Sequence, residues 1–595
     1  MSGICGWLET GKRDGNLTAV RRMMSRLERR GPDHEGSFSD GPLAFGHRRL
    51  AILDLSFRAH QPMVDRERGL AIVFNGSIYN HSVLRKKLRG LGHRFASSSD
   101  TEVILAAFRE WGPACVERLD GMFAFAIWDM QDESLFLARD RQGLKPLYHT
   151  VDDGPLRFAS SVPALLAAGG IDTSFDPTAL HHQFTLHAVV PAPRTIFRGV
   201  NKLPPGHWLR VDRDGKRQMQ RYWAIDTSED ADVPADEWPE IIHQRLFEAV
   251  KKCLTVSDMP AGVLLSGGLD SSLIVALAHE AGVTPKTFTI GFEDQPEEKG
   301  SEFEYADPVA ERYQTEHFRF HVPDKQVLTR LPEAVREMNE PMFGQDAVAF
   351  YLLAEQVASE TKLVLSGQGA DEVFGGYFWY PKMRDAEGSD LERFAPYYFD
   401  RSHEELMSML TARFHGPDAT SELVKKGLAG QDTGPNKSQG SFANRVLGFD
   451  TSTLIVDDPV KRVDSMTMAW GLEARVPFLD TQLIETAMRI PADQKLAQGG
   501  KGVLKTIARG RIPDAVIDRP KGYFPVPALK FVRGPFLEFM REILTSDTAR
   551  ARGLFEPAYV EKLLAEPDQH FTRLQGAKIW HLAVFELWLQ EQGVS

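Results

Sequence analysis

Residues 263–277 read VLLSGGLDSSLIVAL, a short apolar run that breaks at Ser266-Gly267-Gly268 and resumes with helical spacing. The pattern predicts a strand, a tight loop and a helix. The two glycines allow a sharp turn and a close approach of the backbone to a ligand, and the N–H groups at the start of the helix would point into the loop. Such a loop suits a pyrophosphate. Asp270 fits beside it if a Mg²⁺ ion lies between its carboxylate and the phosphates.

The full SGGLDSS run resembles the pyrophosphate loop of the N-type ATP pyrophosphatases. Those enzymes split ATP into AMP and pyrophosphate in order to adenylate a substrate. A bare Ser-Gly-Gly would more often be an ordinary turn with a serine cap, so the strand-to-helix context matters. The resemblance implies an α/β domain with a parallel sheet, and ATP and Mg²⁺ as cofactors. It assigns ATP contacts to Leu265, Ser266, Gly267, Gly268, Asp270, Ser271 and Ser272.

The length and composition are those of a large protein built from packed domains. The chain has 595 residues, of which 42% are hydrophobic and 26% charged. A net charge of −12 argues against nucleic acid or an anionic membrane as the main partner. There is no apolar run of about 18 residues and no leader-like N-terminus, so a cytoplasmic location is expected. The cysteines, Cys5, Cys115 and Cys253, are too few and too scattered for a disulfide framework or a zinc site.

The first third of the chain predicts helices packed on β-sheets. Short apolar runs bounded by Gly and Asp, at residues 70–74, 123–128 and 135–138, are typical of strands. Helical periodicity appears at residues 19–27, 82–91 and 101–111.

Five phrases in this region follow one another in a fixed order. They are RGPD at residues 30–33, GHRRL at 46–50, NGSIYN at 75–80, SDTE at 99–102 and ARD at 138–140. Together they resemble the glutamine amidotransferase domain of the asparagine synthetase family. That resemblance implies the αββα sandwich of the N-terminal nucleophile hydrolases.

The family's roles can be carried over to the matching positions. In the family, an N-terminal Cys attacks the side-chain amide of glutamine, and its own α-amino group serves as the base. By resemblance, Asn75 and the backbone N–H of Gly76 would form the oxyanion hole. Arg49 would hold the α-carboxylate of glutamine, and Asp100 would hold its α-ammonium group.

This chain departs from the family at two positions of that pocket. Ser2 stands in the place of the nucleophile, and Ser77 stands where the family has Glu. Removal of Met1 would expose the α-amino group of Ser2, but a hydroxyl is a weaker nucleophile than a thiolate. Cys5 is a rival, but the register of the neighbouring glycines places it three residues late, so we expect it to be a packing residue. The sequence leaves open whether Ser2 is natural or replaces a Cys.

The second part of the chain predicts a parallel sheet. An acidic stretch without periodicity, residues 226–232, is the best linker, and helical periodicity returns at 238–254. Apolar strands at 287–292 and 363–367 alternate with helical stretches, which favours a parallel sheet with ligands at the carboxyl ends of its strands. The predicted domains are an amidotransferase domain, residues 1–222, and an ATP-dependent synthetase domain, residues 223–595.

Residues 366–377 read SGQGADEVFGGY and form the second strong motif. Asp371 is the predicted partner of Asp270 in binding Mg²⁺. Asparagine synthetases usually carry Glu where Gln368 stands, close to the substrate. The predicted acceptor contacts are therefore Gln368 and Glu372, and the neutral amide suggests an acceptor other than free aspartate. By resemblance, further ATP contacts come from Ile290, Ser366 and Gly367.

Two more stretches match the family. Residues 519–527 read RPKGYFPVP, and by resemblance Lys521 stabilises charge on the α-phosphate and pyrophosphate during adenylation. The charged residues of 462–464 and 473–480 are interpreted mainly as scaffold, because buried charges are usually paired.

The resemblance covers nearly the whole chain and implies an ATP-dependent amide-forming ligase. It would adenylate a carboxylate, transfer ammonia that normally comes from glutamine, and release AMP and pyrophosphate. Gln368 and residues 186–195 and 457–464 look most like the bacterial amidotransferases that make the osmolyte N-acetylglutaminylglutamine amide. Three alternatives stay open: an asparagine synthetase acting on aspartate, a ring-closing ligase such as a β-lactam synthetase or lasso-peptide cyclase, and a non-enzymatic binding protein. A homodimer is also left open.

Overall fold

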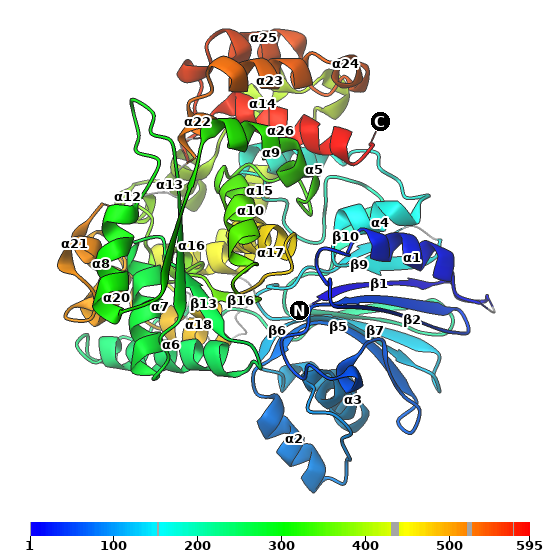
Figure 1. The fold of residues 1–595 in the computed structure, drawn as a ribbon. Coiled ribbons are helices and arrows are strands. Elements are labelled where there is room, and N and C mark those ends of the chain that lie inside the picture. The colour runs from blue at the N-terminus through cyan, green and yellow to red at the C-terminus, as the bar shows by residue number, and fades with distance from the viewer. Residues whose placement is uncertain are drawn as a thin grey trace.

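Residues 2–221 form two antiparallel sheets, and the remainder of the chain is built around one parallel sheet (Figure 1). These two parts of unequal length are called the amino-terminal half and the second half. This computed structural model describes residues 2–12, 14–151, 154–429, 440–520, 526–574 and 576–594. Among these residues, no helix is both long enough and apolar enough to span a membrane.

Two six-stranded sheets lie face to face in the amino-terminal half. The first has the order β10-β8-β9-β1-β3-β2, and the second has the order β12-β11-β7-β6-β5-β4. The strands of the first sheet are β1 (Ser2–Leu8), β2 (His34–Asp40), β3 (Leu43–Arg49), β8 (Tyr148–Thr150), β9 (Leu156–Ala159) and β10 (Val200–Lys202). Those of the second are β4 (Met63–Asp65), β5 (Leu70–Ile78), β6 (Gly121–Asp129), β7 (Ser134–Arg139), β11 (His207–Val211) and β12 (Arg217–Arg221).

Side-chain alternation explains why helices cover the outer faces of this pair of sheets. In β5, Ala71 and Val73 point inward to the other sheet, and Ile72 and Phe74 point outward to helices. The outer face of the second sheet packs on α2 (His81–Gly90) and α3 (Asp100–Trp111), and that of the first sheet packs on α1 (Leu17–Ser25) and α4 (Val162–Ala168). The predicted αββα sandwich is confirmed.

The sheet of the second half is five-stranded and parallel, with the order β15-β14-β13-β16-β17. Its strands are β13 (Ala261–Leu264), β14 (Lys286–Phe292), β15 (His317–Val322), β16 (Leu363–Leu365) and β17 (Glu473–Arg475). The chain builds outward from β13 to β15 and then returns to the other side of β13. The direction therefore reverses between β13 and β16, and at such a point a parallel sheet opens a crevice for ligands.

Helices cover both faces of this sheet, as the sequence predicts. One face packs on a group of helices that includes α6 (Trp238–Thr255), α7 (Leu269–Glu280), α8 (Phe303–Tyr313), α11 (Ala370–Phe374), α16 (Phe442–Phe449), α18 (Thr481–Met488) and α20 (Gly502–Ala508). Around that core lie α12 (Trp379–Asp385), α13 (Asp390–Tyr398), α15 (Ala419–Leu428), α19 (Ala492–Lys495) and α21 (Asp514–Asp518). The other face packs on α9 (Asp324–Arg336), α10 (Asp346–Val357) and α17 (Lys461–Met468).

The last helices of the chain join the two halves. The helices α22 (Pro527–Lys530), α23 (Gly534–Leu544), α24 (Asp547–Arg552), α25 (Pro557–Ala565) and α26 (Lys578–Glu591) lie with α5 (Pro177–Thr185) and α14 (His403–Met409) at the top of Figure 1. Met23 and Phe184 of the first half share one hydrophobic cluster with Trp580 of α26. Because this core crosses the linker, the boundary at residues 222/223 stays a prediction.

Buried ion pairs reinforce that junction. Asp464 of α17 accepts from Arg30 Nη1 and from Lys145 Nζ, both at 3.0 Å, and all three side chains are at most 7% exposed. Lys202 reaches Glu340 at 3.1 Å and also pairs with Asp457. The amino-terminal half therefore holds α17 through charges that are hardly screened by solvent.

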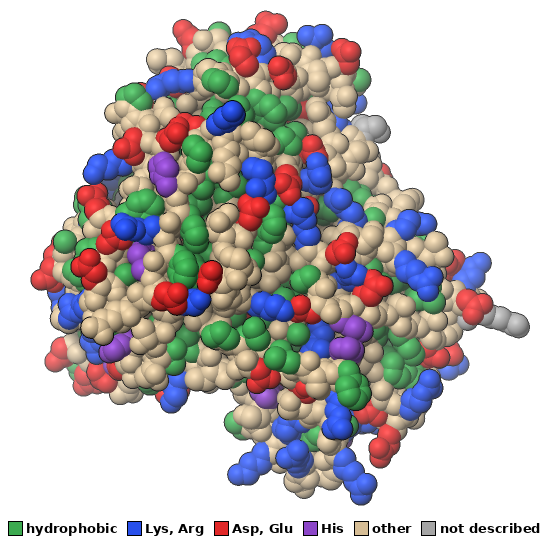
Figure 2. Space-filling view, viewed as in Figure 1, with side chains coloured by type: hydrophobic (Ala, Val, Ile, Leu, Met, Phe, Trp, Pro, Cys, Tyr) green, Lys and Arg blue, Asp and Glu red, His purple; other side chains and the backbone are tan. Residues whose placement is uncertain are grey.

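The surface gives less information about function than the interior. Figure 2 shows acidic and basic side chains intermixed over most of one face. Basic side chains gather at the lower tip, where α2 carries Arg85, Lys86, Lys87 and Arg89. Charges of one sign gather on this face only at that tip, so the arrangement of surface charge gives little indication of a ligand.

Candidate active site

The loop between β13 and α7 has the shape that the sequence predicts. Gly267 has φ +73°, and a Cβ atom there would lie 2.8 Å from the backbone N of Ala306, so only glycine fits without displacement. The hydroxyls of Ser266 and Ser271 lie 3.1 Å apart, and Ser271 Oγ accepts the N–H of Ser266 at 3.2 Å. These bonds fix the loop before any ligand arrives.

A cavity of about 570 Å³ opens beside this loop. Its size lies in the range of about 300–1,000 Å³ that is usual for small-molecule sites. It is bounded by the loop after β13 and by the motif after β16, which is the crevice expected from the strand order. The predicted residues that line it are Leu265, Ser266, Gly268, Asp270, Ser271, Ser366, Gly367, Gln368, Asp371 and Glu372.

Three predicted ATP contacts are not on the cavity wall. Gly267 shapes the turn from behind, and Ser272 is fully buried in α7. Ile290 is 4% exposed and packs in the hydrophobic core on one face of the sheet, next to Phe288 of the same strand, which lines the cavity. A contact of Ile290 with ATP stays a prediction.

Lys501 is the main residue that sequence reasoning missed. It precedes α20, and its Nζ lies 2.6 Å from Asp270 Oδ2 and 2.6 Å from Asp371 Oδ1. Burial opposes the charge on Lys501, but the two carboxylates outweigh burial and hold its pKa above the ordinary value. The sequence predicts a metal ion beside Asp270, and the structure adds an ammonium group to the partners of this carboxylate. The run Gly499-Gly500-Lys501-Gly502 before a helix was the available signal.

The donor set nevertheless fits Mg²⁺. Oxygens of Asp270 and Asp371 converge on one cation, and hard carboxylate oxygens are the ligands that Mg²⁺ prefers. The two side chains are 19% and 14% exposed, so they are reached from the cavity. A magnesium ion would have to displace the ammonium group of Lys501 from this position.

Lys521 lies outside the described residues, so its predicted role stays a prediction. The preceding residues, Arg519 and Pro520, line the cavity, and Arg519 pairs with Glu302. The chain therefore approaches the cavity directly before Lys521.

Beyond the second motif, the cavity wall is rich in charged and hydroxyl groups. Glu372 is 2% exposed and accepts a hydrogen bond from Tyr377 Oη at 2.7 Å. Arg462 Nη2 lies 2.9 Å from Asp346 Oδ2 and also pairs with Asp458. Burial, with the charge of Glu372, holds the pKa of Asp450 well above its ordinary value.

The segment that supplies part of this wall is unusual. Asp450–Leu454 and Val456–Val460 are π-helical, a form that is frequent at functional sites. Asp458 and Arg462, one turn apart, line the cavity, and Asp457 and Asp464 pair with the amino-terminal half. We had interpreted 462–464 mainly as scaffold, but Arg462 is also part of the cavity wall.

A second, much smaller cavity lies in the amino-terminal half. Its volume is about 30 Å³, which leaves room for only one or two waters. The predicted glutamine-site residues are brought together here. Ser2 N–H donates to Asn75 Oδ1 at 3.1 Å. Those that line the cavity are Ser2, Arg49, Gly76, Ser77 and Asp100.

The groups expected to bind glutamine are already engaged. Arg49 Nη1 donates to the carbonyl of Ser56 at 3.1 Å, and Asp100 Oδ2 accepts the N–H of Ile78 at 3.0 Å. Burial raises the pKa of Asp100. A cavity of about 30 Å³ does not hold a glutamine molecule, so binding would require groups around it to move.

The far wall of this small cavity belongs to the other half of the chain. Glu473 and Arg475 of β17 line it and pair at 2.7 Å with neither side chain exposed. Arg475 Nη2 lies 3.4 Å from Ser77 Oγ. The position where the family has Glu therefore faces an arginine of the second half, a contact that sequence reasoning did not anticipate.

The cysteines take no part in either cavity. Cys5 is fully buried in the core next to α1, and burial raises the pKa of its thiol. Cys115 and Cys253 are also buried, with raised pKa values for the same reason. Cys5 is a packing residue, as expected.

Comparison with known proteins agrees with the two folds. Residues 242–590 match the asparagine synthase family, and residues 1–223 match the glutamine amidotransferase domain. The chain is 31% identical to the glutamine-hydrolysing asparagine synthetase 1 of Bacillus subtilis, over 96% of this chain and 93% of that one. It is 30% identical to asparagine synthetase 3 of the same organism, over 99% and 98% of the two chains. It is also 30% identical to asparagine synthetase B of Escherichia coli, over 84% and 78%.

The two cavities, the sheets that position them and these matches lead to one conclusion. The chain belongs to the asparagine synthase family and is an ATP-dependent amide ligase of the glutamine amidotransferase type.

Proposed function

We propose that the protein adenylates a substrate carboxylate at the large cavity and releases AMP and pyrophosphate. A carboxylate is a poor electrophile until one of its oxygens becomes part of a good leaving group. The convergence of Asp270 and Asp371 on one cation, beside a glycine loop that exposes backbone N–H groups, carries this proposal.

Each group of the loop has a task in this reaction. Backbone N–H groups and the hydroxyls of Ser266 and Ser271 would hold the pyrophosphate. Mg²⁺, held by Asp270 and Asp371, would neutralise phosphate charge. Lys501 would then turn its ammonium group to the phosphates, where Lys521 also stabilises charge that develops in the transition state.

For the acceptor we propose N-acetylglutaminylglutamine, amidated at its C-terminal carboxylate in the biosynthesis of the osmolyte amide. The three sequence features that suggest this acceptor lie far apart in the chain. All three contribute to the same cavity: Gln368, then Asp458 and Arg462 of residues 457–464, and His187 of residues 186–195. These residues line one cavity, which supports a common role for them in binding the acceptor.

Aspartate is the second candidate, because the compared relatives are named as asparagine synthetases. A ring-closing ligase is a third, supported by Ser2, Ser77 and the small size of the cavity between them.

One experiment separates these candidates. The protein is incubated with ATP, Mg²⁺ and ammonium together with N-acetylglutaminylglutamine or aspartate, and nucleotide products and amide masses are measured. We expect AMP, pyrophosphate and the dipeptide amide. Release of ADP and phosphate would refute adenylation, and asparagine as the only amide product would replace the proposed acceptor by aspartate.

A further inference from the structure

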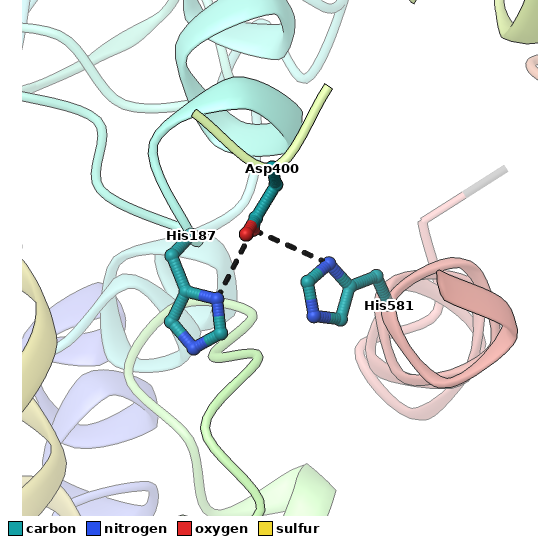
Figure 3. Close-up of side chains that lie close together, drawn as sticks. All are labelled: His187, Asp400 and His581. Carbon is teal, nitrogen blue, oxygen red and sulfur yellow. Dashed lines mark hydrogen bonds and ion pairs between the residues drawn. The ribbon is translucent and has the colours of Figure 1, made fainter. Parts of the chain in front are cut away.

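Three side chains from distant parts of the chain meet next to the large cavity. His187 follows α5, Asp400 precedes α14, and His581 lies on α26 (Figure 3). Asp400 Oδ2 is 3.1 Å from His187 Nδ1 and 3.7 Å from His581 Nδ1. The side chains of Asp400 and His581 are fully buried, and that of His187 is 11% exposed. Neither cavity described so far explains why these groups are brought together.

One hydrogen bond holds the cluster: His187 Nδ1 lies 3.1 Å from Asp400 Oδ2, whereas His581 Nδ1, at 3.7 Å, is only within ion-pair distance. Figure 3 shows both Nδ1 atoms turned toward the same oxygen of Asp400 and both Nε2 atoms turned away from it. The three ligand atoms lie within 4.8 Å of one another, and the shortest contact among them is the hydrogen bond between His187 and Asp400. Asp400 therefore fixes His187 with Nδ1–H as a donor, which leaves Nε2 free to meet a ligand.

The backbone also holds His187 in a particular place. His187 has φ +54° and Ala188 has φ +66°, and neither is a glycine. Non-glycine residues with left-handed backbone are uncommon and tend to occur where a side chain has a task at a site. His187 lines the large cavity together with Gly576. A Cβ atom at Gly576 would lie 3.0 Å from His581 Nε2, so the chain passes this cluster as closely as glycine allows.

The charges around His187 place it at the end of a polar wall. Besides Asp400, the charges of Asp458 and Arg462 affect the pKa of His187. Arg462 also forms ion pairs with Asp346 and Asp458. The charge of Glu372, the residue after Asp371 in the second motif, contributes to raising the pKa of Arg462. Asp371, Glu372, Arg462 and His187 all line the large cavity. An extended acceptor that reacts beside Asp371 would have room in this cavity to reach His187.

We propose that His187 contacts the end of the acceptor that is distal to the reacting carboxylate, and that it recognises a neutral amide group there. The inference rests on the proposed function, because it requires an extended acid as acceptor. Asp400 is the positioning residue, and His581 fills the space behind it.

The charge of the cluster supports a neutral amide. Because Nδ1–H faces Asp400, Nε2 accepts a hydrogen bond when the ring is neutral and donates one when it is protonated, and an amide group offers a partner in either case. Burial lowers the pKa of His187, but Asp400 outweighs burial and the net pKa is raised. Burial holds the pKa of His581 well below its ordinary value, so His581 is neutral. A charged group at this end of the acceptor would find the charge of Arg462 already balanced by Asp346 and Asp458. An N-acetyl or carboxamide oxygen, in contrast, accepts a hydrogen bond without bringing a charge.

The test compares acceptors of different length in ATP–pyrophosphate exchange. N-acetylglutaminylglutamine is compared with N-acetylglutamine, which is one residue shorter, for the wild type, His187→Ala and His187→Gln. We expect His187→Ala to raise the KM for the dipeptide about tenfold or more with little change in kcat, and to leave the KM for N-acetylglutamine and for ATP nearly unchanged. His187→Gln retains a hydrogen-bond donor and should recover part of the loss.

His182→Ala is the matched control. His182 is a buried histidine of α5 that bonds Thr420 Oγ1 at 2.8 Å and does not line the cavity. It should affect both acids equally. If His187→Ala also affected both acids equally, or neither, the inference would be wrong.

The acids that support ATP–pyrophosphate exchange in the wild type distinguish failure of the inference from failure of the proposed function. Exchange with aspartate alone would overturn both. Exchange with another extended acid would overturn only the dipeptide assignment, and the comparison would then use that acid and its shortened form. A loss confined to the longer form would keep the role of His187, and a uniform loss would refute it.

Discussion

Replacement of Lys501 by methionine tests the centre of the proposed adenylation site. The substitution keeps an unbranched side chain that is one atom shorter and removes the charge that lies between Asp270 and Asp371. The Nζ atom is 2.6 Å from an oxygen of each carboxylate, and the Lys501 side chain is 8% exposed, so solvent screens these contacts little. Two charge-assisted bonds at about 1.5–3 kcal/mol each sum to about 3–6 kcal/mol. Breaking a buried ion pair costs about 3–5 kcal/mol, which agrees.

We therefore expect Lys501→Met to lower the free energy of unfolding by about 3–5 kcal/mol in the presence of EDTA. The measurement is urea unfolding followed by tryptophan fluorescence, using the transition that reports the synthetase half. Added Mg²⁺ should stabilise the variant more than the wild type, because in the variant no ammonium group competes for the two carboxylates.

Lys505→Met is the matched control for this experiment. Lys505 lies on α20, one turn after Lys501, and its Nζ donates to the carbonyl of Gln498 at 2.6 Å. We expect a loss of about 1 kcal/mol, as for one hydrogen bond, without a magnesium effect. Equal destabilisation by the two substitutions, or no extra response of Lys501→Met to Mg²⁺, would refute the assignment of this position to a cation site.

Three further predictions concern the reaction and the pH dependence of stability. Asp270→Asn should abolish release of AMP and pyrophosphate, and an adenylation rate near that of the wild type would contradict this. Because Lys501 keeps its ion pair with Asp371 in this variant, the free energy of unfolding should fall less than in Lys501→Met. Ser2→Cys should create or strongly raise glutamine-dependent synthesis, measured as glutamate released per amide formed, without altering the ammonium-dependent rate, because a thiolate is the better nucleophile. Lys495 is fully buried and its pKa falls from 10.5 to about 7, chiefly by desolvation. The unfolded chain therefore binds the extra proton between pH 7 and 10.5, and the stability of the wild type relative to Lys495→Met should rise with pH across that window; parallel curves in urea unfolding would argue against it.

Local pattern was sufficient for much of this protein. The run at residues 263–277 predicts a strand, a loop and a helix, and the structure has β13, a loop with Gly267 at φ +73°, and α7. Helices expected at 82–91 and 101–111 are α2 and α3, with ends that differ by one residue at most. These features follow from hydrophobic periodicity and from turn-forming residues, both of which depend only on residues close together in the sequence.

Other parts of the sites have no local signature. Lys501 lies 231 residues from Asp270, and the sequence gives no measure of where its flexible side chain ends. Ile290 is predicted to contact ATP by resemblance alone, and the sequence does not tell how deeply it is packed under the helices on that side of the sheet.

Short motifs with fixed spacing were enough to predict the family, the two kinds of fold and most of the loop residues that line the large cavity. Tertiary structure alone decided that Lys501 sits between the two acidic side chains. It also decided that Arg475 faces Ser77 across the two halves, and that His187 stands at the end of the large cavity. The physical reason is that a contact between distant segments depends on how strands order and helices pack. Packing is a property of the whole core, and no single stretch of chain encodes it.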